Sequence, residues 1–328
     1  MINPSSVALW YDSPGQAVLR GETLQPAGPD HIVVRALWSG LSRGTERLVF
    51  RGLVPESEWQ RMRAPLQEGD FPFPVKYGYA LVGMVEQGPP DFAGRVVFAL
   101  APHQDYQALP LGFATPLPDG LPPRRAVLSA NMETALNVLW DAEAAPGERI
   151  LIVGGGVLGM LLAGLASQLP GSEVTVSDLL PERAETAAAL GAGFAAADQV
   201  PRDQDLVIHT SASEAGLATA LAAAGQEGRI VEASWFGDKS VSLALGGAFH
   251  SRRLRLISSQ VGRVAASRAT RWDNRRRLAK ALELLQDPRY DLLLGEEIAF
   301  FDLPDRLAAA LDPRAAGFLP LVRYPSTS

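Results

Sequence analysis

The chain has 328 residues, enough for two domains of ordinary size. Its hydrophobic content of 47% is that of a globular protein, and its net charge of −6 argues against a nucleic-acid binder. The absence of cysteine excludes disulfides and thiolate sites and fits a cytoplasmic protein. We expect no secretory signal, and no apolar helix pattern is long enough to span a membrane.

Residues 1–120 carry short strand patterns separated by glycine and proline. Between two of these strands lies a long irregular segment, 51–76, which contains four prolines and several aromatic residues. Its aromatic content favours a packed loop, and loops of this length inside a compact domain are usually functional or disordered. The strands are expected over 7–11, 32–38, 80–85 and 95–100.

A cluster of prolines at 116–123 predicts a domain boundary. Strands and helices alternate after it, which predicts a doubly wound α/β domain with a parallel sheet. The tail is again irregular and strand-like, and we expect it to return to the first domain. The predicted division is a β-rich domain over 1–120, completed by 290–328, and an α/β domain over 121–289. The expected strands of the second domain are 150–153, 174–177, 206–208, 229–232 and 254–258, and the expected helices are 126–141, 157–169, 181–190, 213–224 and 272–285.

A Gly-x-Gly-x-x-Gly motif follows the first apolar strand of the second domain. Gly154 allows a tight turn, Gly156 leaves room for a pyrophosphate, and Gly159 allows the next helix to pack closely. The helix begins here, with Val157 and Leu158 in its first turn. Its free N–H groups and the positive end of its dipole therefore face the phosphates, and the motif predicts a bound dinucleotide.

The next strand ends in Asp178. An acidic residue at this distance from the glycines binds the ribose hydroxyls of NAD and repels the 2′-phosphate of NADP, so we predict NAD. Arg183 is a candidate to lie over the adenine, with a helix salt bridge as the alternative. Ligands bind at the carboxyl ends of parallel strands, so the residues after the later strands are expected to line the nicotinamide side: Thr210, Ser211, Ser234 and Trp235.

The order of a β-rich domain, a dinucleotide-binding domain and a returning tail resembles the medium-chain dehydrogenase/reductase superfamily. The segments 38–46, 77–83 and 130–136 carry the resemblance together with the cofactor half, so that it covers nearly the whole chain. It implies a GroES-like first domain and a Rossmann second domain. Among zinc-free branches, the segments 39–46, 75–79 and 249–262 look like the group typified by bacteriochlorophyllide a dehydrogenase, many of whose members have unknown substrates.

The departures from the family pattern concern its metal. Laid over the family, the catalytic zinc ligands fall on Ser42, Tyr79 and Ala130, none of which is a credible zinc ligand. The structural zinc lobe of the family requires cysteines, and the chain has none. We therefore expect no zinc of the family type and no other metal site.

Without a metal, another group must bind the substrate oxygen and move its proton. Tyr79 is the first candidate, and Lys76 could lower the pKa of its phenol. Thr45 could relay a proton, and Glu46 could orient Lys76 or Arg43. The alternatives are a packed ring for Tyr79, a surface position for Lys76, and a turn with an ion pair for the other two.

Two further residues could take part in proton transfer. Glu133 is a candidate base if it faces the same region, because a carboxylate in a closed cleft can have a raised pKa. Its alternative is to complement the dipole of the helix that it begins. His103 follows a strand and is of the residue type that titrates near neutral pH, although a lone loop histidine is more often incidental.

Together these features lead us to expect a metal-independent NAD(H)-dependent oxidoreductase that moves hydride between the nicotinamide and a secondary alcohol or ketone in the interdomain cleft. The aromatics of 51–76 suggest a bulky, apolar small-molecule substrate. A quinone or enoyl reductase is one alternative, and a non-catalytic dinucleotide-binding protein is another. We expect no nucleic-acid or membrane partner. A homodimer is one option, because dimers are common in the superfamily.

Overall fold

The computed structural model describes residues 5–24, 28 and 30–325. The chain divides into two compact units. Unit 1 comprises Met1–Ala130 and Leu282–Ser328, and unit 2 comprises Asn131–Ala281. Both boundaries fall inside helices, α3 and α7, whereas the sequence placed them at 120 and 289.

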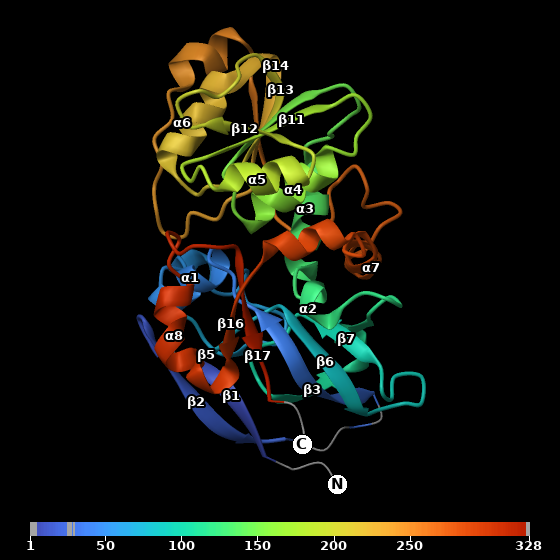
Figure 1. Ribbon diagram of the computed structural model, residues 1–328. Coiled ribbons are helices and arrows are strands. Elements are labelled where there is room, and N and C mark those ends of the chain that lie inside the picture. Colours follow the sequence, from blue (N-terminus) through green and yellow to red (C-terminus); the bar gives the residue numbers. More distant parts are fainter. Residues whose placement is uncertain (1–4, 25–27, 29, 326–328) are drawn as a thin grey trace. The chain divides into compact units, whose positions relative to one another are not determined.

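Unit 1 consists mainly of antiparallel strands in two sheets (Figure 1). One has the order β16-β17-β3-β6-β7-β9, with β8 beside β3, and the other has the order β2-β1-β5-β4. Its strands are β1 (Ser5–Ser13), β2 (Gln16–Thr23), β3 (His31–Gly40), β4 (Glu68–Gly69), β5 (Val75–Lys76), β6 (Leu81–Gln87), β7 (Val96–Ala99), β8 (Tyr106–Pro110), β9 (Ala114–Pro116), β16 (Leu294–Ala299) and β17 (Leu319–Arg323). Its helices are α1 (Thr45–Arg51), α2 (Pro123–Ala126) and α8 (Leu303–Ala310).

The C-terminal tail belongs to the larger sheet of unit 1. β17 pairs antiparallel with β3, with Leu321 opposite Gly40, and β16 pairs parallel with β17. The tail also contains α8, which the sequence analysis did not predict. Its apolar residues Leu303, Leu307 and Ala310 are buried at helical spacing, and the helix packs against β2. The apolar helical pattern is therefore present in the sequence, but it covers only the eight residues of α8.

Unit 2 is a six-stranded parallel sheet with helices around it, in the order β12-β11-β10-β13-β14-β15 (Figure 1). Every strand pair in it is parallel, as the alternation of strands and helices predicted. Its strands are β10 (Arg149–Val153), β11 (Glu173–Asp178), β12 (Gly193–Ala196), β13 (Gln204–His209), β14 (Ala224–Glu232) and β15 (Arg255–Ser258). Its helices are α4 (Val157–Ala166), α5 (Arg183–Ala189) and α6 (Glu214–Ala223), with most of α3 (Ser129–Asp141) and α7 (Asn274–Leu284). Short helical turns elsewhere in the chain are η1 (Glu56–Glu58), η2 (Leu111–Phe113), η3 (Leu245–Phe249), η4 (Pro288–Leu293) and η5 (Phe300–Asp302).

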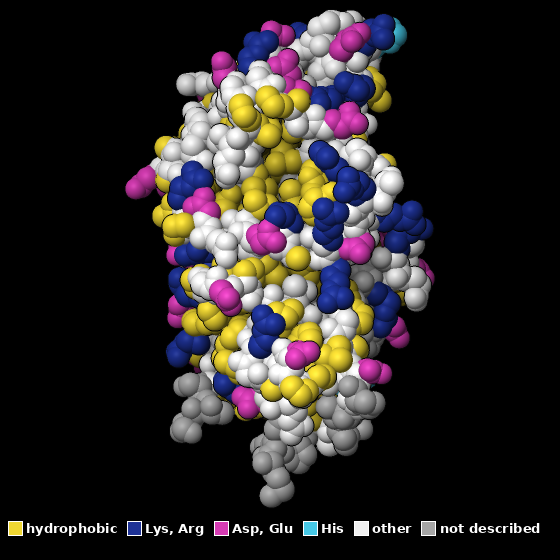
Figure 2. Space-filling view, turned by 90° about the vertical axis from the view of Figure 1, so that its right-hand side faces the viewer, with side chains coloured by type: hydrophobic (Ala, Val, Ile, Leu, Met, Phe, Trp, Pro, Cys, Tyr) yellow, Lys and Arg dark blue, Asp and Glu magenta, His cyan; other side chains and the backbone are white. Residues whose placement is uncertain are grey.

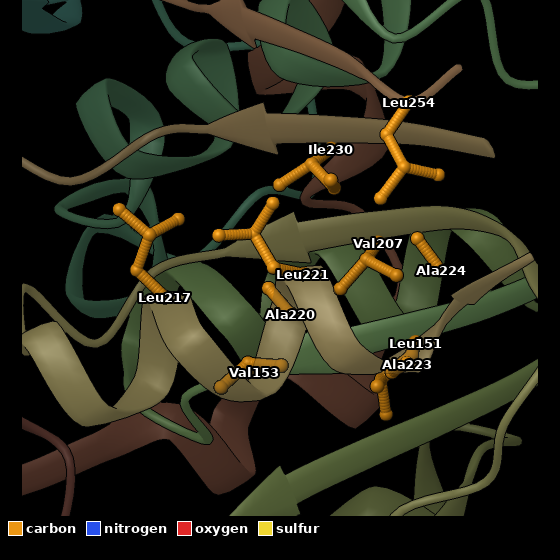
Figure 3. Close-up of a cluster of buried hydrophobic side chains, with 10 residues drawn as sticks. All are labelled: Leu151, Val153, Val207, Leu217, Ala220, Leu221, Ala223, Ala224, Ile230 and Leu254. Carbon is orange, nitrogen blue, oxygen red and sulfur yellow. The ribbon is translucent and has the colours of Figure 1, made fainter. Parts of the chain in front are cut away.

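The core of unit 2 explains why its strands are almost continuously apolar. Ile150, Leu151 and Ile152 of β10 are fully buried, because helices cover both faces of a parallel sheet. Figure 3 shows one side of this core, where the leucine and alanine side chains of α6 pack against β10, β13 and β14. The cluster consists of Leu151, Val153, Val207, Leu217, Ala220, Leu221, Ala223, Ala224, Ile230 and Leu254.

One face of the molecule carries mixed charge. On the face shown in Figure 2, Lys and Arg side chains lie in several separate groups, and Asp or Glu side chains lie close to many of them. Among the described residues, no helix is both long and apolar enough to cross a membrane.

Candidate functional site

The glycine motif of unit 2 turns the end of β10 into the start of α4. Gly154 has φ +113°, and a Cβ there would lie 2.7 Å from the Thr210 Oγ1 atom. A Cβ on Gly159 would overlap the carbonyl oxygen of Gly154, whereas a Cβ on Gly156 would meet no atom within 4 Å. The fold itself therefore requires glycine at 154 and 159, and Gly156 leaves open space at the helix N-terminus.

The N-terminus of α4 has hydrogen-bond donors to offer a ligand. Gly156 is the residue before the helix and supplies no side-chain cap to its first N–H groups. Val157 and Leu158 form the first turn and are half-buried. This arrangement of open space, uncapped N–H groups and helix dipole suits a phosphate group.

Asp178 ends β11 beside the glycine loop. Its Oδ2 atom accepts the Gly155 N–H at 2.6 Å, and its Oδ1 atom accepts the Leu180 N–H at 2.9 Å. The carboxyl group is thereby held at the edge of the loop. Arg183 interacts electrostatically with Asp178. Burial lowers the pKa of Arg183, and the nearby carboxylates of Asp178 and Glu182 partly oppose this shift.

Hydroxyl groups gather where β13 and β14 end, as the sequence predicted for the edge of a parallel sheet. Thr210 Oγ1 donates to the Gly154 carbonyl at 2.8 Å, and Ser234 Oγ accepts the Ala212 N–H at 3.0 Å. Ser211 is exposed, and Trp235 is half-buried.

A buried histidine at the same edge was not predicted. His209 Nδ1 lies 2.6 Å from Glu232 Oε2, and Nε2 lies 2.6 Å from Ser211 Oγ. The available signal was that two neighbouring apolar strands each end in a titratable residue.

In unit 1, the three positions that the resemblance aligned with zinc ligands carry two hydroxyl groups and a methyl group. The Tyr79 hydroxyl hydrogen-bonds the side chains of Ser42 and Thr45, and Ser42 Oγ accepts the Thr45 N–H at 3.2 Å. Ala130 offers no side-chain donor atom. Zinc prefers sulfur, imidazole or carboxylate ligands, so this set does not fit the metal. Across the described ranges, no three His, Cys, Asp or Glu side chains come together as a metal site.

A buried chain of polar side chains lies behind this hydroxyl cluster. Glu46 Oε2 lies 2.9 Å from His103 Nε2, and His103 Nδ1 lies 2.7 Å from Ser39 Oγ. The chain continues at either end: Ser39 Oγ lies 3.0 Å from the Tyr324 hydroxyl, and the Tyr11 hydroxyl donates to Glu46 Oε2 at 3.1 Å. All of these side chains are buried.

Protons can be assigned to this buried chain of side chains so that every hydrogen-bond donor and acceptor in it has a partner. Glu46 accepts from Tyr11, from His103 Nε2 and from the Ser42 N–H at 2.9 Å, which supports a buried carboxylate. His103 Nδ1 then accepts from Ser39, which in turn accepts from Tyr324. His103 therefore has a defined partner on each ring nitrogen and is not an incidental loop histidine.

The predicted role of Lys76 is wrong. Its Nζ atom lies 2.7 Å from Glu22 and 2.5 Å from Glu68, and it donates to Gln104 at 3.1 Å. The pKa of Tyr79 is raised, not lowered, first by burial and then by the negative charge of Glu46. Glu46 also does not orient Lys76, because its carboxylate is occupied by the groups named above.

Glu133 has a partner that the sequence did not reveal. Its Oε1 atom lies 3.0 Å from Arg277 Nε, and both side chains are buried. Burial raises the pKa of Glu133, and the Arg277 charge opposes this shift. Arg277 also donates to Asn137 Oδ1 and to the carbonyl of Arg263, so the pair ties α3 to α7 and to the loop before α7. The geometry of Glu133 is that of a structural ion pair.

The fold of this chain occurs in solved dehydrogenase structures. Acetophenone reductase from Geotrichum candidum NBRC 4597, in complex with NAD, matches with a TM-score of 0.79 and 15% identity over 98% of each chain. A protein from Sinorhizobium meliloti 1021 named as a zinc-binding dehydrogenase and bound to NADP matches with a TM-score of 0.78 and 18% identity, over 98% of this chain and 100% of that one. The 2R,3R-butanediol dehydrogenase from Bacillus subtilis matches with a TM-score of 0.77 and 15% identity, over 98% and 100% of the two chains. No protein-family model matches the chain. These similarities establish the architecture of a GroES-like unit and a Rossmann unit.

Proposed function

We propose that the protein is an NAD(H)-dependent oxidoreductase of the medium-chain type, which moves hydride between the nicotinamide and a secondary alcohol or ketone without a metal ion. The observation that carries the proposal is the glycine loop. Gly156 leaves open space in front of the uncapped N-terminus of α4, and the Asp178 carboxylate is held beside it. The solved structures with the same fold include proteins bound to NAD and NADP.

Different groups of unit 2 would bind different parts of the cofactor. The α4 N-terminus would take the pyrophosphate, and Asp178 would accept hydrogen bonds from the adenosine ribose. A 2′-phosphate would meet the Asp178 charge, so NAD is favoured over NADP. When bound, the nicotinamide accepts or supplies a hydride.

The hydroxyl cluster of unit 1 would bind the substrate oxygen. Because burial and the Glu46 charge raise the pKa of Tyr79, its phenol stays protonated and can donate a hydrogen bond to a carbonyl oxygen. The hydroxyls of Ser42 and Thr45 hydrogen-bond the phenol and hold it in place. This role differs from that of a phenolate base and fits ketone reduction, in which the oxygen must receive a proton.

The substrate class proposed is a bulky, apolar secondary alcohol or ketone. Its support is the aromatic content of 51–76 and the name of one protein with the same fold, acetophenone reductase. Part of that aromatic content is structural, since Phe71 and the neighbouring Tyr77 are buried. The substrate is therefore best sought with a panel of ketones that differ in size.

The test combines binding with turnover. NADH and NADPH are titrated by fluorescence against the protein and its Asp178→Asn variant, with Asp198→Asn, an exposed position of unit 2, as the matched control. We expect NADH to bind at least tenfold more tightly than NADPH, a difference of about 1.4 kcal/mol, and Asp178→Asn to remove most of this preference.

Turnover is then measured with acetophenone, smaller ketones and quinones, with and without a chelator. We expect ketone reduction that resists chelation. A stoichiometric zinc in the purified protein, or activity lost to the chelator, would overturn the metal-free mechanism. Tighter NADPH binding with quinone turnover would favour the reductase alternative, and NADH binding without any turnover would favour a non-catalytic dinucleotide-binding protein.

A further inference from the structure

A serine, a histidine and a carboxylate line up at the carboxyl edge of the unit 2 sheet. His209 is the last residue of β13 and lies directly opposite Glu232, the last residue of β14, in the parallel register. The His209 ring joins Glu232 Oε2 through Nδ1 and Ser211 Oγ through Nε2, with both distances 2.6 Å. His209 is fully buried, Glu232 is half-buried and Ser211 is exposed.

The hydrogen bonds around this trio fix the tautomer of the histidine. Glu232 accepts the Ser234 N–H through Oε1 at 2.8 Å and the His209 Nδ1–H through Oε2. Nε2 is then free to accept the proton of Ser211. Ser211 Oγ lies 2.8 Å from Ser213 Oγ, which can donate to it. This is the proton arrangement of a serine nucleophile with its general base and its orienting carboxylate.

The surrounding backbone makes room for the serine–histidine contact. A Cβ on Gly216 would overlap Ser211 Oγ and lie 2.7 Å from His209 Nε2, so any other residue there would displace the pair. Ala212, next to Ser211, has φ +49°, a conformation that residues other than glycine rarely adopt. Ser234 holds it there by accepting its N–H. Strain of this kind is often found at functional sites.

We propose that Ser211 is a base-activated nucleophile and that unit 2 carries an acyl-transfer site for small esters. Ser211 Oγ attacks the ester carbonyl carbon, and its proton passes to His209 Nε2. His209 returns this proton to the leaving alcohol as the ester C–O bond breaks, which leaves the acyl group on Ser211. Water then attacks the acyl carbon, with His209 as base, and a carboxylic acid is released.

The first turn of α6 can stabilise the negative charge that forms on the carbonyl oxygen. Ser213 caps the helix by accepting the Gly216 N–H at 3.0 Å. The N–H groups of Glu214 and Ala215 have no acceptor within the described part of the chain. Two free N–H groups and a positive helix end thus lie in the turn that follows the nucleophile. Ser211 is also expected to line the nicotinamide side, so both experiments below use the protein without added NAD(H), and their outcomes do not depend on the oxidoreductase function.

The first experiment measures the reactivity of Ser211 directly. The full-length protein is treated with a fluorophosphonate probe, and the modified peptides are quantified by mass spectrometry. We expect Ser211 to react at least about 100-fold faster than Ser57, an exposed serine of unit 1 without a histidine partner, because general-base catalysis contributes about 10²–10⁴-fold. Equal rates at the two serines would overturn the proposal.

The second experiment follows the hydrolysis of p-nitrophenyl acetate. We expect Ser211→Ala and His209→Gln each to lower the rate by about 100-fold or more, Glu232→Gln to lower it by a smaller factor, and Ser57→Ala to leave it unchanged. Because His209 is fully buried, its substitution also tests folding, so the exposed Ser211→Ala variant decides the result. A rate unchanged in Ser211→Ala contradicts the site.

Discussion

Glu46 Oε2 lies 2.9 Å from His103 Nε2, and neither side chain has any exposed surface. The carboxylate also accepts hydrogen bonds from Tyr11 and from the Ser42 N–H. Glu46→Ala would leave these donors buried without an acceptor, so we expect the free energy of unfolding to fall by about 3–5 kcal/mol, since each unsatisfied buried donor costs about 1–3 kcal/mol. Urea denaturation measures the change.

The control for this substitution is Glu58→Ala. Glu58 pairs with Arg61 near the surface, so its loss should change the free energy of unfolding by less than about 1 kcal/mol. If the two variants lose similar stability, the buried chain contributes nothing beyond a surface ion pair.

Tyr79→Phe tests the hydroxyl cluster. If the phenol donates to the substrate oxygen, turnover of a ketone should fall by about 10²–10³-fold, as for other lost transition-state donors. Binding of NADH should be unaffected, because the cofactor contacts are assigned to unit 2. Tyr106→Phe removes a hydroxyl from β8 of the same unit and should keep normal turnover. Unchanged turnover in Tyr79→Phe would remove the residue from the mechanism.

Four buried tyrosines should make the protein sensitive to alkali. Burial raises the pKa of Tyr11, Tyr77, Tyr290 and Tyr324 above the unfolded value of about 10. A group whose pKa is raised by folding stabilises the folded state fully below its unfolded pKa, and this contribution is lost as the pH rises toward its folded pKa. We therefore expect the thermal midpoint to fall above about pH 10.

The measurement pairs thermal melts with tyrosinate absorbance at a series of alkaline pH values. Tyrosinate should form together with unfolding. Complete titration of all six tyrosines near their ordinary pKa, with the fold intact, would show that these phenols are not buried as described.

Two glycines of the same motif should respond differently to alanine. A Cβ on Gly156 meets open space, so Gly156→Ala should keep the thermal midpoint while weakening NADH binding about tenfold or more, since the methyl group occupies space needed by the pyrophosphate. A Cβ on Gly159 overlaps the Gly154 carbonyl, so Gly159→Ala should lower the free energy of unfolding by about 1–3 kcal/mol. Equal stability of the two variants would contradict the different packing at these positions.

The parts of the fold that the sequence predicted depend on local patterns. The apolar run before Gly154 indicated a strand with both faces buried, and the alternation after it indicated a parallel sheet; both are confirmed. α8 and β12 were missed because their apolar patterns are short. The helix predicted over 126–141 corresponds to α3, which begins three residues later, and α2 is a separate short helix that ends at Ala126.

The candidate site likewise contains features that local sequence patterns predicted and features that they did not. Local patterns indicated that Gly154, Gly156 and Asp178 belong to one dinucleotide-binding edge, because the strand–loop–helix order determines where they lie. The ion-pair partners of the buried charged residues could not be predicted from local patterns, because they are far away in the sequence. Arg277 is 144 positions from Glu133, and Glu22 is 54 positions from Lys76.

The sequence by itself therefore determined the architecture, the glycine loop and the lack of zinc-ligand side chains at 42, 79 and 130. Only the tertiary structure decided which titratable groups meet: Glu46 with His103 in unit 1, and His209 with Glu232 in unit 2. The physical reason is that strand and helix periodicity act over a few residues. A buried charge, by contrast, is stabilised by whichever distant segment the packed fold brings against it.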